Sequence, residues 1–389
     1  MMENKSNLGT IAMGVRLPVI REGDNIAQMV VKSVIAASNE MGLKVEDGDV
    51  FAITESIVAR AEGNYITVDD IAKDIIGKFG ENADIAVIHP IYSRNRFSLI
   101  LKGIARAARK VKVIYAGNCD EVGNETENPY TGVDILEFYH KIVAEEGAIY
   151  EEEFSDEGSI SGALDGYDNV IVATIHSRYN VQFTLEHKFS KLVQNQIPDL
   201  PFPYMSVPAK KIYRLDEICN KKTDGKTGYN DVFGILGSNK SGDEVLKLFP
   251  RPSTCQTLVN QIRDELWEIY DAKVEVMVYG DGAYKDPVSG IWELADPVVS
   301  PGYTEGLEGK PNEVKLKYIV DSENLSDDEL LKRIMDNKDS DSVDSMSKQG
   351  TTPRHYTDLL GSLSDLVTGS GDKGTPIVWV KNYFKKYCD

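Results

Sequence analysis

The sequence predicts an α/β (α+β) fold, because strand-like and helix-like segments alternate along most of the chain. Short apolar runs that end in turn residues have the length and composition of strands, and they lie at residues 49–54, 83–89, 111–117, 169–175, 273–280 and 376–381. Helical periodicity separates several of them, at residues 25–42, 69–80, 97–110, 131–147 and 255–271. A chain of 389 residues exceeds the usual size of one compact core, so we expect one two-lobed domain or two domains.

Residues 187–253 break this alternation. Prolines are frequent in the stretches 198–208 and 248–254, which excludes a continuous helix and indicates a long excursion from the core. We therefore expect a discontinuous core formed by residues 1–186 and 254–389, with an inserted lobe at residues 187–253.

Composition limits the classes of partner. The formal net charge of −19 would repel a phosphate backbone over most of the surface, so we expect no nucleic-acid partner. No apolar run approaches the roughly 20 residues of a membrane helix, and the first residues lack the pattern of a secretory signal, so we expect no membrane partner. The four cysteines form no CxxC pair, which favours a reducing cytoplasm. An acidic protein that binds anions needs local positive groups or a bound cation, which suggests a divalent metal.

A glycine-rich segment lies at residues 368–376, where Gly369, Gly371 and Gly374 have GxGxxG spacing. A dinucleotide-binding loop of that type follows a strand and opens a helix, whereas here a helical pattern precedes the glycines and a strand follows them. Two interpretations remain open. The segment is either a helix-to-strand turn, or a flexible loop whose backbone N–H groups approach a phosphate beside Lys373.

Two aspartates stand directly beyond predicted strands. Asp120 follows the strand at 111–117, and Asp281 follows the strand at 273–280. Carboxylates at strand ends often face a ligand crevice and could share a hard divalent cation with phosphate oxygens. The alternative is that both residues only terminate strands in turns, which aspartate also favours.

Two further segments have residues suited to anions. Glu55, Ser56 and Arg60 follow the strand at 49–54, where a hydroxyl and a guanidinium are able to hold phosphates, although a simple capped helix start explains them equally well. Arg94 and Arg96 lie between a strand and a helix, a position that suits a substrate carboxylate or phosphate or, alternatively, surface ion pairs. No histidine stands in a recognisable catalytic pattern, and we expect His176 and His187 to be structural.

Taken together, these segments resemble the coenzyme F420-0:L-glutamate ligase family. The opening signature of that family matches Leu17-Pro18-Val19-Ile20 with Gly23-Asp24, and its next element matches Gly48-Asp49-Val50 with Ala59-Arg60-Ala61-Glu62-Gly63. Its metal aspartates look like Asp120 and Asp281, and its glycine-rich nucleotide loop looks like residues 368–375. The five elements occur in the family's order and cover roughly half of the chain, but residues 187–253 and 305–355 find no counterpart.

The resemblance implies a gamma-glutamyl-ligase-like fold, here with an inserted lobe, and a homodimer. It also implies a ligase that uses GTP (or ATP) and Mg2+ or Mn2+ to join L-glutamate to a carboxylate acceptor through an acyl phosphate. The nucleotide-binding residues would be Leu17, Pro18, Val19, Ile20, Glu55, Ser56, Arg60, Asn124, Thr368, Gly369, Ser370, Gly371, Asp372, Lys373, Gly374 and Thr375. The metal site would comprise Asp120, Asp281, Gly282 and Ser370.

The chain departs from the family pattern at three of these positions. Gly282 and Ser370 replace a hydroxyl residue and an acidic or amide ligand, and Arg60 replaces a lysine. Two other functions therefore stay open: a glutamate ligase with a folate-type or pterin-type acceptor, and a non-catalytic nucleotide-binding regulatory protein.

Overall fold

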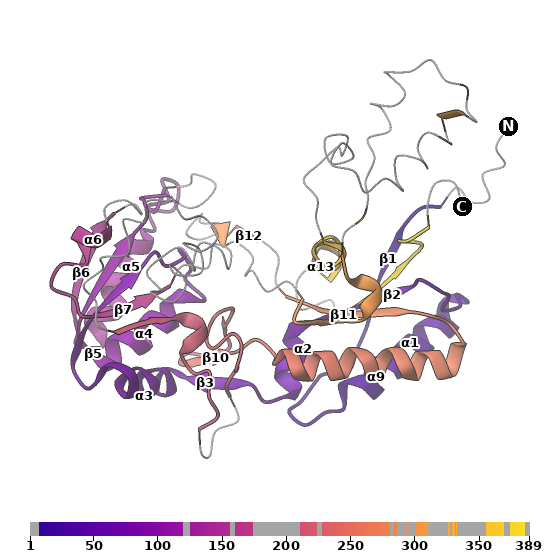
Figure 1. The fold of residues 1–389 in the computed structure, drawn as a ribbon, viewed down its shortest axis with the longest axis horizontal. Helices are drawn as coiled ribbons and strands as arrows, with labels where there is room; N and C mark the ends of the chain where they lie inside the picture. Colours follow the sequence, from indigo (N-terminus) through magenta and orange to yellow (C-terminus); the bar gives the residue numbers. More distant parts are fainter. Residues whose placement is uncertain are drawn as a thin grey trace, which may run out of the picture.

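The protein consists of two lobes that lie side by side (Figure 1). The computed structural model describes residues 8–119, 125–155, 160–173, 211–223, 228–280, 300–309, 355–368 and 374–385, with short pieces at 284–285, 292–293, 311, 326, 329–330 and 332. Each lobe is built on its own five-stranded sheet. We call them the mixed-sheet lobe and the parallel-sheet lobe.

The mixed sheet has the strand order β1-β15-β2-β11-β14. Its strands are β1 (Ile11–Val15), β15 (Ile377–Lys381), β2 (Val50–Thr54), β11 (Glu275–Tyr279) and β14 (Gly302–Tyr303). Only β2 and β11 run parallel to each other, and the other neighbours are antiparallel. Segments from both ends of the chain therefore lie next to one another in a single sheet.

Helices cover both faces of the mixed sheet. On one face, α1 (Ile26–Met41) and α9 (Pro252–Tyr270) pack on side chains that include Phe51 and Ile53. On the other face, α13 (Tyr356–Thr368) packs on side chains that include Val50 and Ala52. Burial on both faces explains why β2 is a continuous apolar run rather than an alternating one.

The parallel sheet has the order β6-β5-β4-β7-β8, with every pair of neighbours parallel. Its strands are β4 (Ala83–Ile88), β5 (Ala108–Tyr115), β6 (Ile149–Phe154), β7 (Asn169–Val172) and β8 (Lys211–Arg214). Helices α3 (Val68–Phe79), α4 (Phe97–Ala107) and α5 (Ile135–Glu145) pack on one face, and α6 (Ile160–Ala163) lies on the other. The strand order reverses between β4 and β7, which is the place where open parallel sheets usually bind ligands at their carboxyl edge.

Two adjacent strands connect the lobes. The chain leaves the mixed-sheet lobe after α2 (Glu55–Ala61) and enters the other lobe through β3 (Tyr65–Thr67). It returns through β10 (Val245–Lys247), which pairs antiparallel with β3 and also with β9 (Asn239–Lys240). Buried Asn64 reinforces the crossing by donating from Nδ2 to the carbonyl of Phe249 at 2.7 Å.

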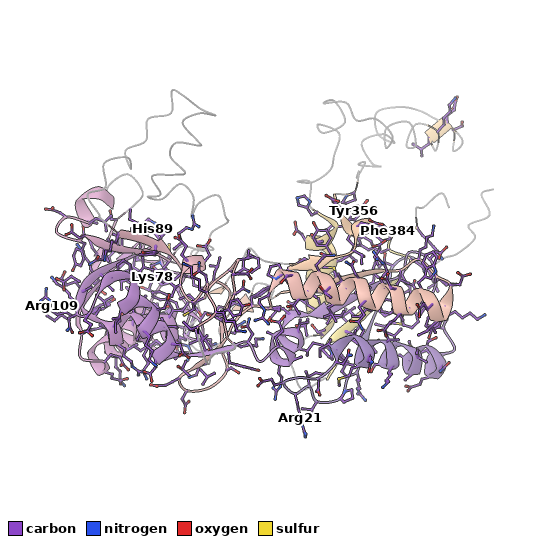
Figure 2. The ribbon with its side chains drawn as sticks, turned by 60° about the horizontal axis from the view of Figure 1, so that its bottom comes forward. Arg21, Lys78, His89, Arg109, Tyr356 and Phe384 are labelled. Carbon is purple, nitrogen blue, oxygen red and sulfur yellow. The ribbon has the colours of Figure 1, made fainter. Side chains whose placement is uncertain are left out.

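Short elements complete the described chain: the 3-10 helices η2 (Leu215–Glu217) and η3 (Glu305–Leu307), and the two-residue strands β12 (Tyr284–Lys285) and β13 (Trp292–Glu293). Figure 2 shows Tyr356 and Phe384 together on the mixed-sheet lobe, and the centroids of their rings are 5.4 Å apart. This contact fastens the start of α13 to the segment after β15. In the part of the chain that the structure describes, no helix is long and apolar enough to cross a bilayer.

The α/β class predicted from the sequence is confirmed, and a strand or helix stands at each of the eleven predicted positions. In the two five-stranded sheets, strands β1, β6, β8 and β14 were not predicted. Residues 211–214 and 245–247, which belong to the predicted inserted lobe, form β8 of the parallel sheet and the partner of β3. The division into a core and an inserted lobe itself stays a prediction, and residues 187–210 lie outside the described part of the chain.

Candidate active site

Four strand ends meet at one edge of the mixed sheet. Strands β2 and β11 are parallel and in register, so Thr54 and Tyr279 end side by side. Strand β15 is antiparallel to β2 and therefore begins at this edge, with Ile377 opposite Ile53. Strand β1 ends there too, because Val15 pairs with Ile377. We call this the candidate edge, and it brings together the segments that follow β1, β2 and β11 and the one that precedes β15.

Backbone hydrogen bonds join the predicted nucleotide segments at the candidate edge. The amide of Leu17 donates to the carbonyl of Gly374 at 3.2 Å, and the amide of Thr54 donates to Pro376 at 3.0 Å. Pro18 and Val19 continue from Leu17 as exposed residues, with Val19 78% exposed, whereas Ile20 is buried. Thus the sequence signature at 17–20 and the end of the glycine segment are neighbours in space.

Thr375 presents an unused polar group at this edge. Its Oγ1 is buried and has no hydrogen-bond partner among the described residues. Gly14 of β1 makes room for this side chain, because a Cβ on Gly14 would lie 3.0 Å from the Cβ of Thr375. A buried hydroxyl without a partner costs free energy, so a position that keeps one is suited to an oxygen-rich ligand.

The other end of the glycine segment is anchored beside β11. The hydroxyl of Tyr279 donates to Oγ1 of Thr368 at 3.1 Å, and Thr368 is the last residue of α13. Residues 369–373 lie outside the described part of the chain. Their two flanking residues, Thr368 and Gly374, are therefore held at the ends of β11 and β1, so that the segment between them starts and finishes at the candidate edge.

Lys247 is a charged residue of this edge that sequence reasoning missed. Its Nζ lies 3.0 Å from Oε1 of Glu55 and 2.7 Å from Oγ of Ser56. Glu55 and Ser56 open α2 directly after β2, whereas Lys247 comes from β10, 192 residues away from Glu55 in sequence. No local pattern signals such a pair. Arg60 stands on the same helix as an exposed residue of its last turn.

Other residues of the family signatures have structural roles. Asp49 precedes β2 at the opposite end from the candidate edge and is buried. Its Oδ2 accepts hydrogen bonds from the indole of Trp379 at 2.9 Å, from Nζ of Lys381 at 2.8 Å and from the amide of Glu46 at 3.0 Å. This carboxylate therefore fastens β2 to β15 and does not face the proposed nucleotide site.

The Glu62-Gly63 pair has a similar structural explanation. Oε2 of Glu62 accepts from the backbone amide of Arg251 at 3.4 Å and lies 3.3 Å from its Nη2, so the carboxylate stabilises the start of α9. Burial raises the pKa of Glu62, and the positive charge of Arg251 partly opposes that shift. Gly63 has φ 63°, and a Cβ there would also meet the Glu22 side chain at 2.5 Å, so only glycine fits.

Arg94 and Arg96 lie at the carboxyl edge of the parallel sheet, in the segment that joins β4 to α4. Arg96 is buried, and the hydroxyl of Tyr139 accepts from the amide of Ser93 at 2.6 Å, which fixes the segment. His89 at the end of β4 has φ 46°, a strained conformation for a residue with a Cβ. Figure 2 shows His89 on the parallel-sheet lobe.

Asp120 and Asn124 lie outside the described residues, but the residues on either side of them are described. The described residues that flank them, Cys119 and Glu125, form an isolated bridge just after β5. The hydroxyl of Tyr92 donates to the carbonyl of Gly117 and so links this segment to the one after β4. The structure thus gathers Arg94, Arg96 and the flanks of Asp120 at the parallel sheet, and the remaining described candidates at the mixed sheet.

All four residues of the predicted metal site lie outside the described part of the chain. Asp120, Asn124, Asp281, Gly282, and residues 369–373 with Ser370 lie outside the described residues, as do His176 and His187. Within the described ranges, no group of three or more His, Cys, Asp or Glu side chains is placed to hold a metal ion. The described neighbours of the two aspartates, Cys119 and Gly280, follow strands of different sheets.

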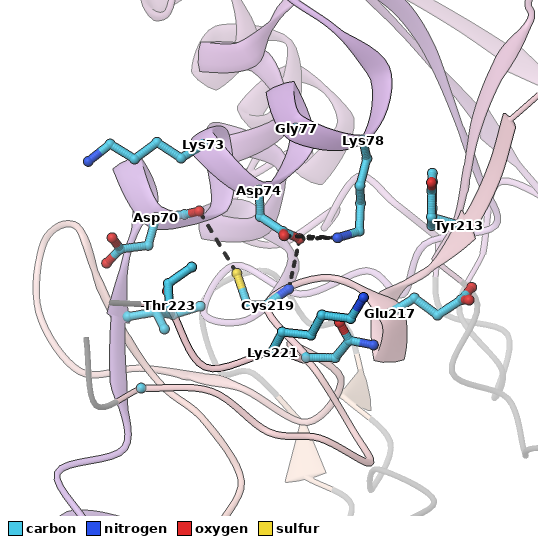
Figure 3. Close-up of a pocket in the computed structure, with 13 residues that line it drawn as sticks. Asp70, Lys73, Asp74, Gly77, Lys78, Tyr213, Glu217, Cys219, Lys221 and Thr223 are labelled. Carbon is cyan, nitrogen blue, oxygen red and sulfur yellow. Dashed lines mark hydrogen bonds and ion pairs between the residues drawn. The ribbon is translucent and has the colours of Figure 1, made fainter. Parts of the chain in front are cut away.

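A cavity of about 620 Å³ lies elsewhere, between α3 and residues 213–228 of the parallel-sheet lobe (Figure 3). Asp74 organises its wall by pairing with Lys78 at 2.8 Å and by accepting from the amide of Cys219 at 2.9 Å. Burial raises the pKa of the Cys219 thiol, which keeps it protonated. Lys73 and Lys221 at its rim are exposed, and the cavity contains none of the predicted site residues.

The fold and the candidate edge thus define a two-lobed α/β protein whose signature segments converge from both ends of the chain. A family model described as F420-0:Gamma-glutamyl ligase matches residues 14–382. The chain belongs to the F420-0:gamma-glutamyl ligase family, as its sequence motifs indicated.

One curated relative is the coenzyme F420:L-glutamate ligase of Methanothermobacter thermautotrophicus strain Delta H. It is 36% identical to this chain over 84 residues, which are 20% of this chain and 32% of the relative. The chain therefore matches about a third of the length of that relative.

Proposed function

We propose that this protein is a ligase that uses a nucleoside triphosphate, GTP or ATP, to add L-glutamate to a carboxylate acceptor through an amide bond. The membership in the gamma-glutamyl ligase family supports the reaction class. The observation that carries the proposal is the convergence of Leu17, Glu55, Ser56, Thr368 and Thr375 at the candidate edge, although they come from distant parts of the chain.

The nucleotide is proposed to bind along the candidate edge, with the glycine segment over its phosphates. Oγ1 of Thr375, which has no hydrogen-bond partner among the described residues, is proposed to donate to a phosphate oxygen. Arg60 and Lys373 would add positive charge, and the residues at 17–20 would line the entrance. Since phosphoryl transfer depends mainly on position and on charge stabilisation, fixed donors of this kind suffice for the protein's part in the step.

Mg2+ or Mn2+ is proposed to bind Asp120 and Asp281, whose carboxylates are the ligands that hard divalent cations prefer. Such an ion offsets negative charge on phosphate oxygens. Because the two aspartates follow strands of different sheets, an ion held by both must lie between the lobes. Gly282 and Ser370, which also belong to the predicted metal site, would contribute at most backbone or hydroxyl oxygen.

The proposed reaction has two steps. A carboxylate oxygen of the acceptor takes the terminal phosphoryl group, and the nucleoside diphosphate leaves. The amine of glutamate, once it has lost a proton, then attacks the acyl carbon, phosphate leaves with the electron pair of the C–O bond, and the amide forms. Arg94 and Arg96 at the parallel sheet are proposed to hold a substrate carboxylate, for which a guanidinium provides a bidentate partner.

A product assay tests the function. The purified chain is incubated with radiolabelled glutamate, GTP or ATP, Mg2+ or Mn2+, and a panel of acceptor acids that includes deazaflavin and pterin types. We expect label in an amide product and one equivalent of nucleoside diphosphate for each bond. Nucleotide binding without product from any acceptor would instead favour the non-catalytic regulatory protein, and a product from pterin acceptors alone would favour the folate-type ligase.

We also propose a homodimer in a cytoplasmic setting, on the basis of the family and the composition respectively. Multi-angle light scattering at micromolar concentration tests the dimer. A mass near 43.1 kDa, that of one chain, would contradict it, whereas twice that mass is expected.

A further inference from the structure

The ammonium group of Lys247 is held at the candidate edge by two side chains. It lies 3.0 Å from Oε1 of Glu55 and 2.7 Å from Oγ of Ser56. The Glu55 side chain is 2% exposed, whereas the Lys247 side chain keeps 12% of its surface exposed. A ligand can therefore reach the lysine of this ion pair but not the glutamate.

An ammonium carries three N–H donors. Glu55 and Ser56 account for two of them, and the structure shows no third acceptor for Lys247 within the described residues. Its two neighbours along the chain do not compete, since Leu246 and Leu248 are completely buried and apolar. One donor of a fixed cation thus remains available on the exposed side.

The position of this donor matches that of the proposed nucleotide. Glu55 directly follows Thr54, and the amide of Thr54 donates to Pro376, the residue after Thr375. A lysine held by a buried glutamate is also the arrangement by which protein kinases direct an ammonium at nucleotide phosphates. A side chain ordered before the ligand arrives loses little further rotamer freedom when it binds.

We propose that Lys247 is an anion-binding residue of the candidate active site, and that its remaining N–H donates to a phosphate oxygen of the nucleoside triphosphate. Glu55 and Ser56 are then positioning residues, which aim the ammonium. This assignment rests on the proposed function, which supplies the nucleotide. Lys247 lies outside the segments that carry the family signatures, so the parallel-sheet side of the β3–β10 crossing contributes a residue to the site.

The test compares phosphate ligands with a ligand that has no phosphate. Binding of a fluorescent GTP analogue, of inorganic tripolyphosphate by competition, and of guanosine is measured for the wild type, Lys247→Met and Lys247→Gln. Loss of one charge-assisted hydrogen bond should weaken GTP and tripolyphosphate by about 10- to 100-fold. Guanosine should bind unchanged. Glu55→Gln should weaken the phosphate ligands less, because the charge remains and only its orientation is lost.

Lys240→Met is the matched control, since Lys240 is an exposed lysine of the neighbouring strand, opposite Leu246. It should leave all three affinities unchanged. Thermal melts identify variants that fail to fold, and Lys247→Gln, which still hydrogen-bonds to Ser56, then replaces Lys247→Met.

Three outcomes would overturn the assignment: unchanged phosphate affinity in a folded Lys247 variant, an equal loss for guanosine, or no phosphate binding by the wild type. The proposed function has a separate readout. If amide product forms but the Lys247 variants bind nucleotide as the wild type does, the role of Lys247 is rejected and the ligase function stands. If tripolyphosphate binding depends on Lys247 but no product forms, the role of Lys247 stands and the ligase function is rejected.

Discussion

At the scale of single residues, the family signature segments contain both side chains that stabilise the fold and side chains that are open to a ligand. Asp49 and Glu62 belong to family signatures, yet both are engaged in structural contacts, with Trp379 and Arg251 respectively. Thr375 packs against Gly14, and its buried Oγ1 has no hydrogen-bond partner among the described residues. A sequence signature therefore locates the region of the site. The side-chain contacts in the structure then show which of its residues stabilise the fold and which remain for a ligand.

Thr375→Val tests this distinction. Valine has nearly the shape of threonine, so it fits against Gly14, and it removes a buried hydroxyl that lacks a partner. We expect the free energy of unfolding to stay the same or rise by about 1 kcal/mol, because an unsatisfied polar group is lost. Nucleotide affinity should fall by about tenfold if the hydroxyl donates to a phosphate.

Urea unfolding and titration with a fluorescent GTP analogue measure the two effects. Thr257→Val, which changes an exposed threonine of α9, provides the control for the substitution itself. A Thr375→Val protein that is less stable but binds nucleotide normally would show that the hydroxyl serves the fold alone.

At the scale of elements, the sequence predicts best those strands that are buried on both faces. Strands β2, β4 and β15 are largely apolar, because helices cover them on each side. Strand β6 escaped prediction since it is an edge strand with Glu151, Glu152 and Glu153 at its centre, two of which pair with Lys110 and Lys112 of β5. The strand is held by its backbone pairing with β5, so its sequence does not need an apolar run.

The residues of the candidate site were predictable only where they lie next to such apolar strands. The residues that flank strands, such as Glu55 and Thr375, are visible because strand ends can be read from apolar runs. Lys247 was not, because its strand is only three residues long and it meets Glu55 only through the pairing of β10 with β3. Contacts between residues so far apart in sequence produce no periodic pattern from which they can be predicted.

Asp49→Asn tests whether one edge of the mixed sheet serves stability while the opposite, candidate edge serves nucleotide binding. The substitution keeps the shape of the side chain but removes the charge that faces Lys381, whose own side chain is 7% exposed. Lys381 then keeps Glu46, at 3.2 Å, and the carbonyl of Lys44 as partners but loses its buried carboxylate, so the free energy of unfolding should fall by about 2 kcal/mol. Nucleotide affinity well below the melting temperature should not change, because Asp49 lies at the far end of β2.

Guanidinium unfolding at neutral pH gives the stability change. Asp264→Asn, at an exposed carboxylate of α9 that pairs with its neighbour Arg263, is the control and should cost less than about 1 kcal/mol. A large loss of nucleotide affinity in folded Asp49→Asn would contradict the structural role.

At the scale of the whole molecule, the proposed metal site would link the two lobes. Asp120 follows the parallel sheet and Asp281 follows the mixed sheet. If one Mn2+ ion binds both, the ion must restrain the two lobes. We expect Mn2+ with nucleotide to raise the melting temperature and to reduce the radius of gyration in X-ray scattering.

Asp120→Asn and Asp281→Asn should each abolish both effects and the activity, with little change in the stability of the metal-free protein. Calorimetric titration gives the Mn2+ affinities of both variants. Binding of wild-type strength in either one would remove that aspartate from the site, and tight binding without compaction would place the ion within a single lobe.

The antiparallel β3–β10 pair also has a consequence for how this chain can be shortened. Tyr65 and Lys247 stand opposite each other in register, so the whole parallel-sheet lobe begins and ends at neighbouring points. Paired residues in an antiparallel ladder are about 5 Å apart, a distance that a two-residue turn closes. All five strands of the mixed sheet lie before residue 55 or after residue 274. A gene that joins residue 65 to residue 247 through a short turn therefore encodes all five strands of the mixed sheet together with α1, α9 and α13.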